Sequence, residues 1–244
     1  MDDRKIAFEV VLAMFLRFLW LSLLLAAVTV AAGNVGLQVD AGVSMPWSGY
    51  LKNIETGERV EIIKRANFRA FFQTTIGYTF FEEHSIEAMI SPFSIESRLE
   101  QDGDEGPTEY TSRYVQDTYR LRYRYLLPPL ERFCLQIGLH ATLQMKELVI
   151  DGSREYTNKW INFSFGPSAL ISISMNEIVS LIIEVEAGIG ADNGFLDIFA
   201  GLNLSGPFYF VRAGIRNLST NGFSGVEALS TSFWNFGAQF RAVF

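Results

Sequence analysis

Charged residues recur at alternate positions in this sequence, and that spacing decides which of them can act together. In an extended strand, alternate side chains share one face. Three arginines of one run therefore project from a common face, and acidic residues of other alternating runs occupy the equivalent face. This candidate cluster consists of Arg120, Arg122, Arg124, Glu87, Glu184 and Glu186. Because charges that leave bulk water must be paired, we expect mutual neutralisation. The alternative is a charged constriction that controls the passage of ions.

His140 and Thr142 are the candidates for catalysis, because they lie two residues apart on one face of another alternating run. A hydrolase or acyltransferase of this kind needs a histidine, a hydroxyl nucleophile and an orienting carboxylate. Threonine is a poorer nucleophile than serine in that role, and no acidic residue can be placed beside the pair. We therefore favour a hydrogen-bonded structural histidine and a protein that is not an enzyme, with catalysis as the alternative.

The composition argues against several other kinds of site. Two histidines and one cysteine, Cys134, provide little material for a metal site and none for an intrachain disulfide. We expect no metal and no cofactor. A net charge of −7 without any basic stripe argues against nucleic acid as a partner.

The elements that must position these residues have a period of two. Beyond residue 33, apolar residues alternate with polar or small ones in run after run, and no stretch fits a helical period as well. We predict an all-β fold with about ten strands, eight being the alternative. Most predicted strands exceed the length of about five or six residues that is usual in soluble sheets, and they match tilted strands that cross a bilayer. Their spans are 35–45, 66–80, 85–96, 113–127, 132–146, 160–174, 178–190, 195–204, 208–217 and 231–244.

The N-terminal residues predict export. A stretch without any charge, Phe18 to Ala32, ends in small residues, so residues 1–32 are interpreted as a signal peptide that is cleaved after Ala31 or Ala32. Residues 33–244 then form a single β-barrel domain. The connections between its predicted strands alternate between long and short, which places tight turns at one end of the barrel and long loops at the other.

The C-terminal strand carries aromatic residues on one face, with Phe236, Phe240 and the terminal Phe244 at even spacing. This pattern resembles the assembly signal of bacterial outer-membrane β-barrel proteins. Together with the export signal, it makes the chain similar to the small-barrel group of these proteins, without a match to an individual family. The resemblance implies a closed antiparallel transmembrane barrel in the outer membrane of a Gram-negative-type bacterium. It also implies membrane lipid and the outer-membrane assembly machinery as partners.

A barrel of about ten strands has a narrow interior, so the charged cluster would fill it. Aromatic residues near the strand ends predict girdles at both membrane interfaces. The outer girdle would comprise Trp47, Tyr50, Tyr114, Tyr156, Phe195, Phe233 and Trp234. We expect an integral outer-membrane protein that acts as a structural or surface-binding protein, with an extracellular ligand at its long loops, or as a narrow channel. The alternative is a membrane-embedded enzyme that modifies lipid or lipopolysaccharide through His140.

Overall fold

The computed structural model describes residues 33–63, 69–81, 83–103, 106–151, 156–191, 193–206, 209–224 and 227–243. The predicted signal peptide, residues 1–32, and the terminal Phe244 lie outside the described residues. Within these ranges, no helix is long and apolar enough to span a membrane.

Nearly all of the described chain is β-strand, as the alternation predicts. Each strand pairs antiparallel with its neighbours in the chain, apart from the short β2. The strands are β1 (Gly33–Asn53), β2 (Arg59–Ile63), β3 (Arg69–Phe80), β4 (His84–Gly103), β5 (Gly106–Leu126), β6 (Phe133–Asp151), β7 (Tyr156–Ser174), β8 (Val179–Ile189), β9 (Asn193–Ser205), β10 (Tyr209–Ser224) and β11 (Glu227–Val243).

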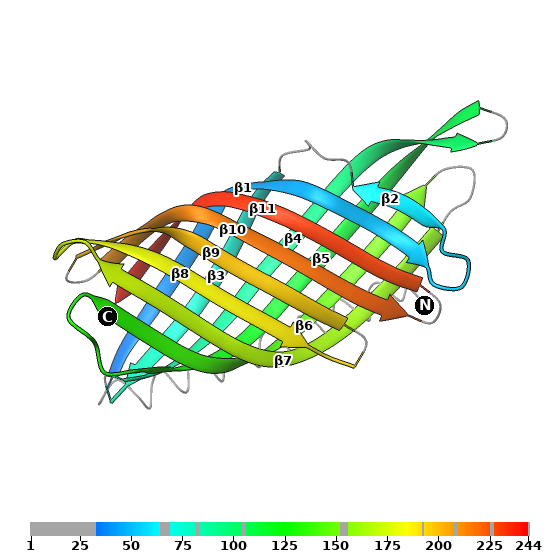
Figure 1. The fold of residues 1–244 in the computed structure, drawn as a ribbon. Helices are drawn as coiled ribbons and strands as arrows, with labels where there is room; N and C mark the ends of the chain where they lie inside the picture. Colours follow the sequence, from blue (N-terminus) through cyan, green and yellow to red (C-terminus); the bar gives the residue numbers. More distant parts are fainter. Residues whose placement is uncertain are drawn as a thin grey trace, which may run out of the picture.

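The last strand closes the sheet onto the first (Figure 1). β11 pairs with β1 from Gly36↔Val243 to Asn53↔Glu227, so neither strand is left as a free edge along this seam. Of the eleven strands, β2 pairs only with β1, and the closed wall therefore has ten. The predicted ten-stranded barrel is confirmed, and closure satisfies the backbone hydrogen bonds that a bilayer could not.

Two expectations about the connections are wrong. Sequence periodicity did not predict β2, which is too short for its alternation to stand out. The stretches that we expected to be long loops are largely extensions of the strands, and β4 and β5 stay paired as far as Gly103↔Gly106. This hairpin projects beyond the rest of the wall (Figure 1). We call this end of the barrel the extended end, and the end with the tight connections 81–83, 127–132 and 175–178 the turn end.

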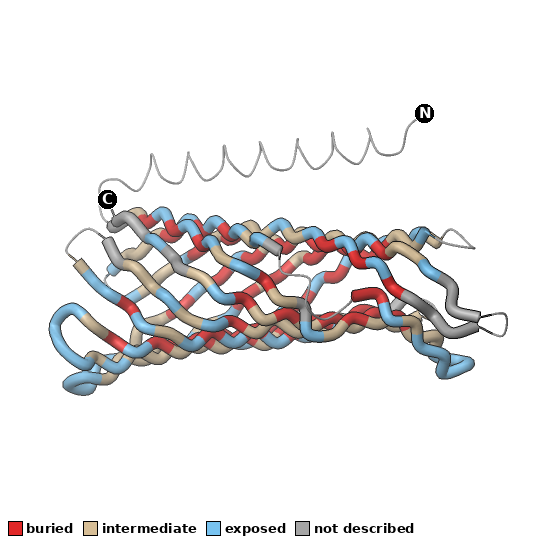
Figure 2. Tube along the Cα trace, turned by 90° about the horizontal axis from the view of Figure 1, so that it is seen from above, coloured by how far each residue is buried: buried red, intermediate tan, exposed pale blue. Residues whose placement is uncertain are grey.

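Buried and exposed residues alternate along the barrel strands (Figure 2). The inward face is mostly polar, whereas the outward face carries apolar side chains such as Leu139, Phe163 and Phe240 that are at least half exposed. Water-soluble monomers rarely expose so much contiguous apolar surface. The outward face is therefore a lipid-contacting surface, of the kind that surrounds transmembrane barrels.

A row of glycines crosses four adjacent strands on the inward side of the wall. Gly42 pairs with Gly237, Gly237 with Gly214, and Gly214 with Gly201. The buried ring of Phe199 covers part of this row, because a Cβ at Gly214 would lie 2.9 Å from its Cζ and 2.3 Å from the backbone oxygen of Ala200. The row therefore provides room for the Phe199 ring inside a narrow barrel.

Replacing Gly214 with alanine should destabilise the barrel by about 1–3 kcal/mol, because the added methyl group overpacks the interior. Gly194→Ala is a matched control, since its Cβ would meet its nearest neighbour at 3.5 Å. Denaturant unfolding of both variants in detergent, followed by the altered gel mobility of unheated samples, measures the difference. Equal stability of the two variants would contradict the close contact at Gly214.

Candidate functional site

A network of charged side chains fills the middle of the lumen. It contains five arginines and five carboxylates, which balance in formal charge and are contributed by β1, β4, β5, β8, β9 and β10. The members are Arg120, Arg122, Arg124, Arg212, Arg216, Asp40, Glu87, Glu184, Glu186 and Asp197. We call this set the charged plug.

Arg120 occupies the part of the plug nearer the extended end. Its Nη1 pairs with Glu186 and lies 2.9 Å from Asp197 Oδ2. Glu186 and Asp197 are directly opposite each other on β8 and β9, so one guanidinium group separates two carboxylates that would otherwise repel. Arg216 pairs with the other oxygen of Asp197 at 2.7 Å and donates a hydrogen bond of 2.6 Å to Gln73 Oε1.

Arg122 and Arg124 lie nearer the turn end and share their acidic partners. Arg122 is paired with Glu87 at 3.1 Å, with Glu184 at 2.5 Å and with Glu186 at 2.6 Å. Arg124 pairs with Glu184 and with Glu186, and its Nε donates a hydrogen bond of 2.8 Å to Ser168 Oγ. Each glutamate of β8 thus accepts from more than one arginine of β5, and the six predicted residues do form one cluster.

Little free space is seen among the described side chains of the plug. A cavity of about 10 Å³ remains between Gln38, Gln73, Thr75, Glu87, Arg122, Arg124, Glu184, Arg212 and Arg216. That volume is at the lower limit for one water molecule. The side chains of Arg120, Arg122 and Arg124 are almost completely buried, so the network closes the lumen at this level.

His140 and Thr142 lie together, buried in the lumen beside Arg120 of the plug. The His140 Nε2 atom is 3.2 Å from the carbonyl oxygen of Ala187, which can only accept, so Nε2 carries the proton. Nδ1 then accepts from the Thr142 hydroxyl at 3.2 Å, and Thr142 Oγ1 accepts from Arg120 Nε at 3.1 Å. Both residues are buried, at 2% and 0% exposure, so no substrate can approach the hydroxyl group in this arrangement. In this arrangement, Thr142 holds the Arg120 side chain by a hydrogen bond.

An apolar cap closes the lumen on the extended side of the plug. Its buried members are Leu51, Ile62, Ile63, Ile95, Tyr114, Leu148, Trp160, Leu229 and Phe233. Two of them, Ile62 and Ile63, come from β2, which explains why this short strand folds back against β1. A smaller cluster of Leu170, Ile182 and Phe199 lies on the turn side of the plug.

The predicted outer girdle of aromatic residues is wrong for three of its members. Tyr114, Phe195 and Phe233 are buried in the lumen instead of facing the membrane interface. Alternation contained the necessary signal, because Tyr114 has the same parity as Arg120 on β5, and Phe195 the same parity as Asp197 on β9. The proximity of these residues to strand ends outweighed that signal in our prediction.

Other predicted residues are placed as follows. Phe236 and Phe240 of the proposed assembly signal face outward, at 40% and 52% exposure, and Phe244 is not among the described residues. Asp40, Asp197, Arg212 and Arg216 belong to the plug although our candidate set omitted them; their parity on their strands is the signal that would have included them. In the described ranges, no group of three histidine, cysteine, aspartate or glutamate side chains is arranged to hold a metal ion.

Comparisons with known proteins support the fold. No family model and no curated protein matches the sequence. Among solved structures, the outer-membrane protease OmpT from Escherichia coli superposes with a TM-score of 0.64 at 11% identity, over 86% of this chain and 97% of that one. The chain has the fold of a bacterial outer-membrane β-barrel. This fold and the apolar outward face agree with the outer-membrane location that the sequence predicts.

Two further similar structures are also bacterial outer-membrane proteins. The COG4313 outer-membrane channel from Pseudomonas putida F1 gives a TM-score of 0.42 at 7% identity, over 87% of this chain and 96% of that one. The attachment invasion locus protein Ail of Yersinia pestis gives 0.37 at 8% identity, over 86% and 99%. Their superpositions are too loose to support an argument about function.

Replacing Glu186 with glutamine should lower the free energy of unfolding by about 3–5 kcal/mol, because buried guanidinium groups lose a shared counter-charge. Glu186 pairs with Arg120, Arg122 and Arg124, so no single neighbour can compensate. Denaturant titration of the detergent-solubilised barrel measures the loss.

Glu147→Gln provides the matched control, because Glu147 pairs with Lys159 at 3.7 Å on the solvent-accessible outer surface. Removal of such an exposed pair costs at most about 1 kcal/mol. If Glu186→Gln were as mild as Glu147→Gln, the plug would not be the stabilising network described above.

Proposed function

We propose that this protein is a closed, non-conducting outer-membrane barrel with a structural and surface-binding role. The observation that carries the proposal is the filled lumen: the described side chains of the charged plug enclose a cavity of about 10 Å³ between them. The apolar cap adds a second closure on the extended side. An ion would have to separate paired charges and then cross an apolar layer.

The balance of charge in the plug also favours closure over selective conduction. Selective pores expose an excess of one sign to the passing ion. Here five guanidinium groups face five carboxylates, and the carboxylates of Glu184 and Glu186 are each shared between arginines. Each charged group of the described plug already has a counter-charge, so a passing ion would have to compete for its partner.

The extended end supplies the surface for binding. Tight turns at one end and longer projections at the other are typical of barrels whose projections face the cell exterior. The hairpin of β4 and β5 continues beyond the other strands to Gly103 and Gly106 (Figure 1). This hairpin would meet an external partner first.

An enzymatic role has less support from the geometry. The OmpT structure is that of a protease, and a shared fold does not transfer an activity. The only described histidine apart from His140 is His84, whose Nδ1 lies 2.7 Å from the Tyr123 hydroxyl near the turn end. His140 itself lies buried against the ring of Phe195.

The purified protein should give no single-channel steps in planar lipid bilayers, since plug and cap close the lumen in series. Replacing Arg122 with glutamine should not create steps, because the cap remains. The measurement is current against time at fixed voltage. Steady openings in the wild type, with an ion selectivity that Arg122→Gln alters, would show a charged constriction in place of a plug.

Expression of the protein in an outer-membrane host should leave the mass spectrum of lipid A unchanged, because the Thr142 hydroxyl is inaccessible. Wild type, His140→Ala and an empty-vector strain are compared. A mass shift that is present with the wild type and lost with His140→Ala would establish the lipid-modifying alternative instead.

A further inference from the structure

The wall of the barrel has a window where β8 and β9 stop short. β7 continues to Tyr156, yet its described pairing with β8 begins only at Phe165↔Ile189. Above the β8–β9 hairpin, the wall closes again through side chains: the Tyr156 hydroxyl and Asn158 Nδ2 both donate to Glu227 Oε2, at 2.5 and 2.9 Å. Between Asn158 and Phe165, β7 therefore has an edge without a paired strand, and the wall is closed on both sides of this gap.

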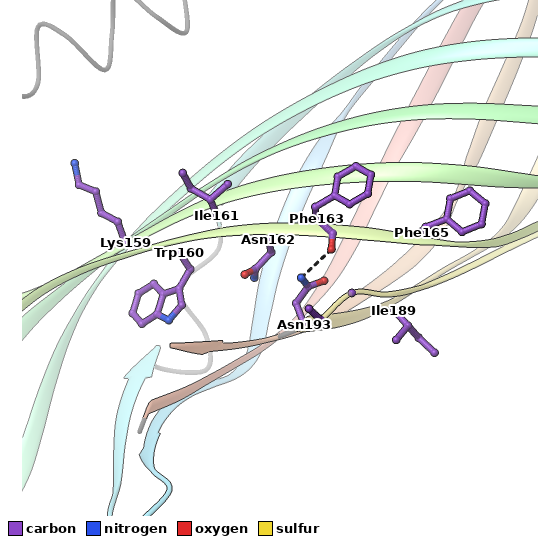
Figure 3. Close-up of a pocket in the computed structure, with 10 residues that line it drawn as sticks. Lys159, Trp160, Ile161, Asn162, Phe163, Phe165, Ile189 and Asn193 are labelled. Carbon is purple, nitrogen blue, oxygen red and sulfur yellow. Dashed lines mark hydrogen bonds between the residues drawn. The ribbon is translucent and has the colours of Figure 1, made fainter. Parts of the chain in front are cut away.

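A cavity of about 450 Å³ lies at this window, between β7 and the tip of the β8–β9 hairpin. Its lining comes from both faces of β7 (Figure 3). Ile161, Phe163 and Phe165 lie on one side of the strand, and Trp160 and Asn162 point to the other (Figure 3). The cavity thus connects the lipid-contacting surface with the lumen.

The outward side of the window is apolar and unusually exposed. Ile161 is 73% exposed, Phe163 61% and Ile189 79%, the last being among the most exposed large apolar side chains of the described barrel. These residues lie at the upper limit of the apolar surface, because the next outward residues on β6 and β7 are Glu147 and Lys159, which form an ion pair. An apolar chain from the surrounding membrane fits this rim.

The inward side of the window presents donors without acceptors. Gln144 pairs with Asn162, and Lys146 with Trp160, across β6 and β7, so four inward side chains form one compact patch. Gln144 Nε2, Asn162 Nδ2 and Trp160 Nε1 are buried and have no hydrogen-bond partner among the described residues.

The Lys146 amine is a further buried donor in this patch. Its Nζ donates to Thr220 Oγ1 at 3.0 Å, and no carboxylate of the described residues pairs with it. Both Asn162 and Trp160, which neighbour it on β7, line the cavity. Unsatisfied buried donors, and a buried amine without a carboxylate partner, are costly, and an anionic group with several acceptor oxygens would satisfy them together.

We propose that this window binds one phosphate-bearing lipid of the surrounding membrane. The lipid chain lies on Ile161, Phe163, Phe165 and Ile189. The phosphate oxygens accept from Trp160 and Asn162, which line the cavity, and from Gln144 and Lys146, their direct neighbours on β6. The combination of an apolar rim outside and a hydrogen-bond donor patch inside matches an amphiphile better than a free anion, which would gain nothing from the rim. This site is separate from the plug and does not depend on whether the barrel conducts.

Native mass spectrometry of the detergent-solubilised full chain tests the proposal with three probes. Phosphatidylglycerol supplies chains and phosphate, a diacylglycerol with the same chains lacks the phosphate, and inorganic phosphate lacks the chains. We expect one molecule of phosphatidylglycerol to be retained about tenfold more tightly than the diacylglycerol. Inorganic phosphate at the same concentration should not displace it.

The variants separate the two halves of the site. Lys146→Gln should weaken retention of phosphatidylglycerol by about tenfold, and Ile189→Ser should weaken it several-fold. Leu202→Ser removes an outward apolar side chain elsewhere on the barrel, and Arg98→Gln removes an exposed cation on β4, away from the cavity. Both control variants should retain the lipid within about twofold of the wild type.

Trp160→Phe provides a second test if Lys146→Gln does not fold, because it removes the unpaired N–H and keeps the apolar ring. It should weaken phosphatidylglycerol several-fold and leave the diacylglycerol unchanged. Equal retention of the two lipids by the wild type would overturn the proposal. So would displacement by inorganic phosphate, which would indicate a site for a free anion. A loss with Arg98→Gln but not with Lys146→Gln would also overturn it, because it would indicate general surface attraction.

Discussion

The pairing of buried arginines with carboxylates across the lumen is the constraint on which the rest of the structure depends. Arg120, Arg122 and Arg124 all belong to β5, whereas Glu184 and Glu186 belong to β8, three strands away. A slip of one residue in the pairing of either strand would turn these side chains out toward lipid and leave their partners uncompensated. The network therefore fixes the register of strands that have no backbone contact with each other, and with it the closure of the barrel.

Features that depend on local alternation could be predicted from the sequence. The strand count, the inward direction of Arg122 and the outward direction of Phe240 each follow from a period of two within one strand. The clustering of Glu87 with Arg122 was also within reach, because the two are direct neighbours on β4 and β5. Consecutive strands of a hairpin pair with each other, so the position of the turn predicts which residues of the two strands lie opposite.

Features that depend on distant strands could not be predicted. β2 contributes Ile62 and Ile63 to the cap, but its five residues have no pattern that separates a strand from a loop. The sharing of Glu186 among three arginines depends on how far each side chain reaches across the lumen, which varies with barrel tilt and width and not with sequence spacing. The window arises from a difference in length between β7 and β8, and only the paired strands show where the shorter one ends.

The interior is layered, and the layers differ in how well their polar groups are satisfied. The plug matches cations to anions, and Arg120, Arg122, Arg124 and Arg216 each have at least two side-chain partners. One layer closer to the extended end, Gln144, Lys146, Trp160 and Asn162 present donors with a single described acceptor, Thr220. The plug supplies a carboxylate for each of its five guanidinium groups. The lack of acceptors is therefore confined to the layer of Lys146 and is not a general property of the lumen. These donors without acceptors lie where β8 and β9 end short of β7. At this gap in the wall, an acceptor from outside the chain can reach them.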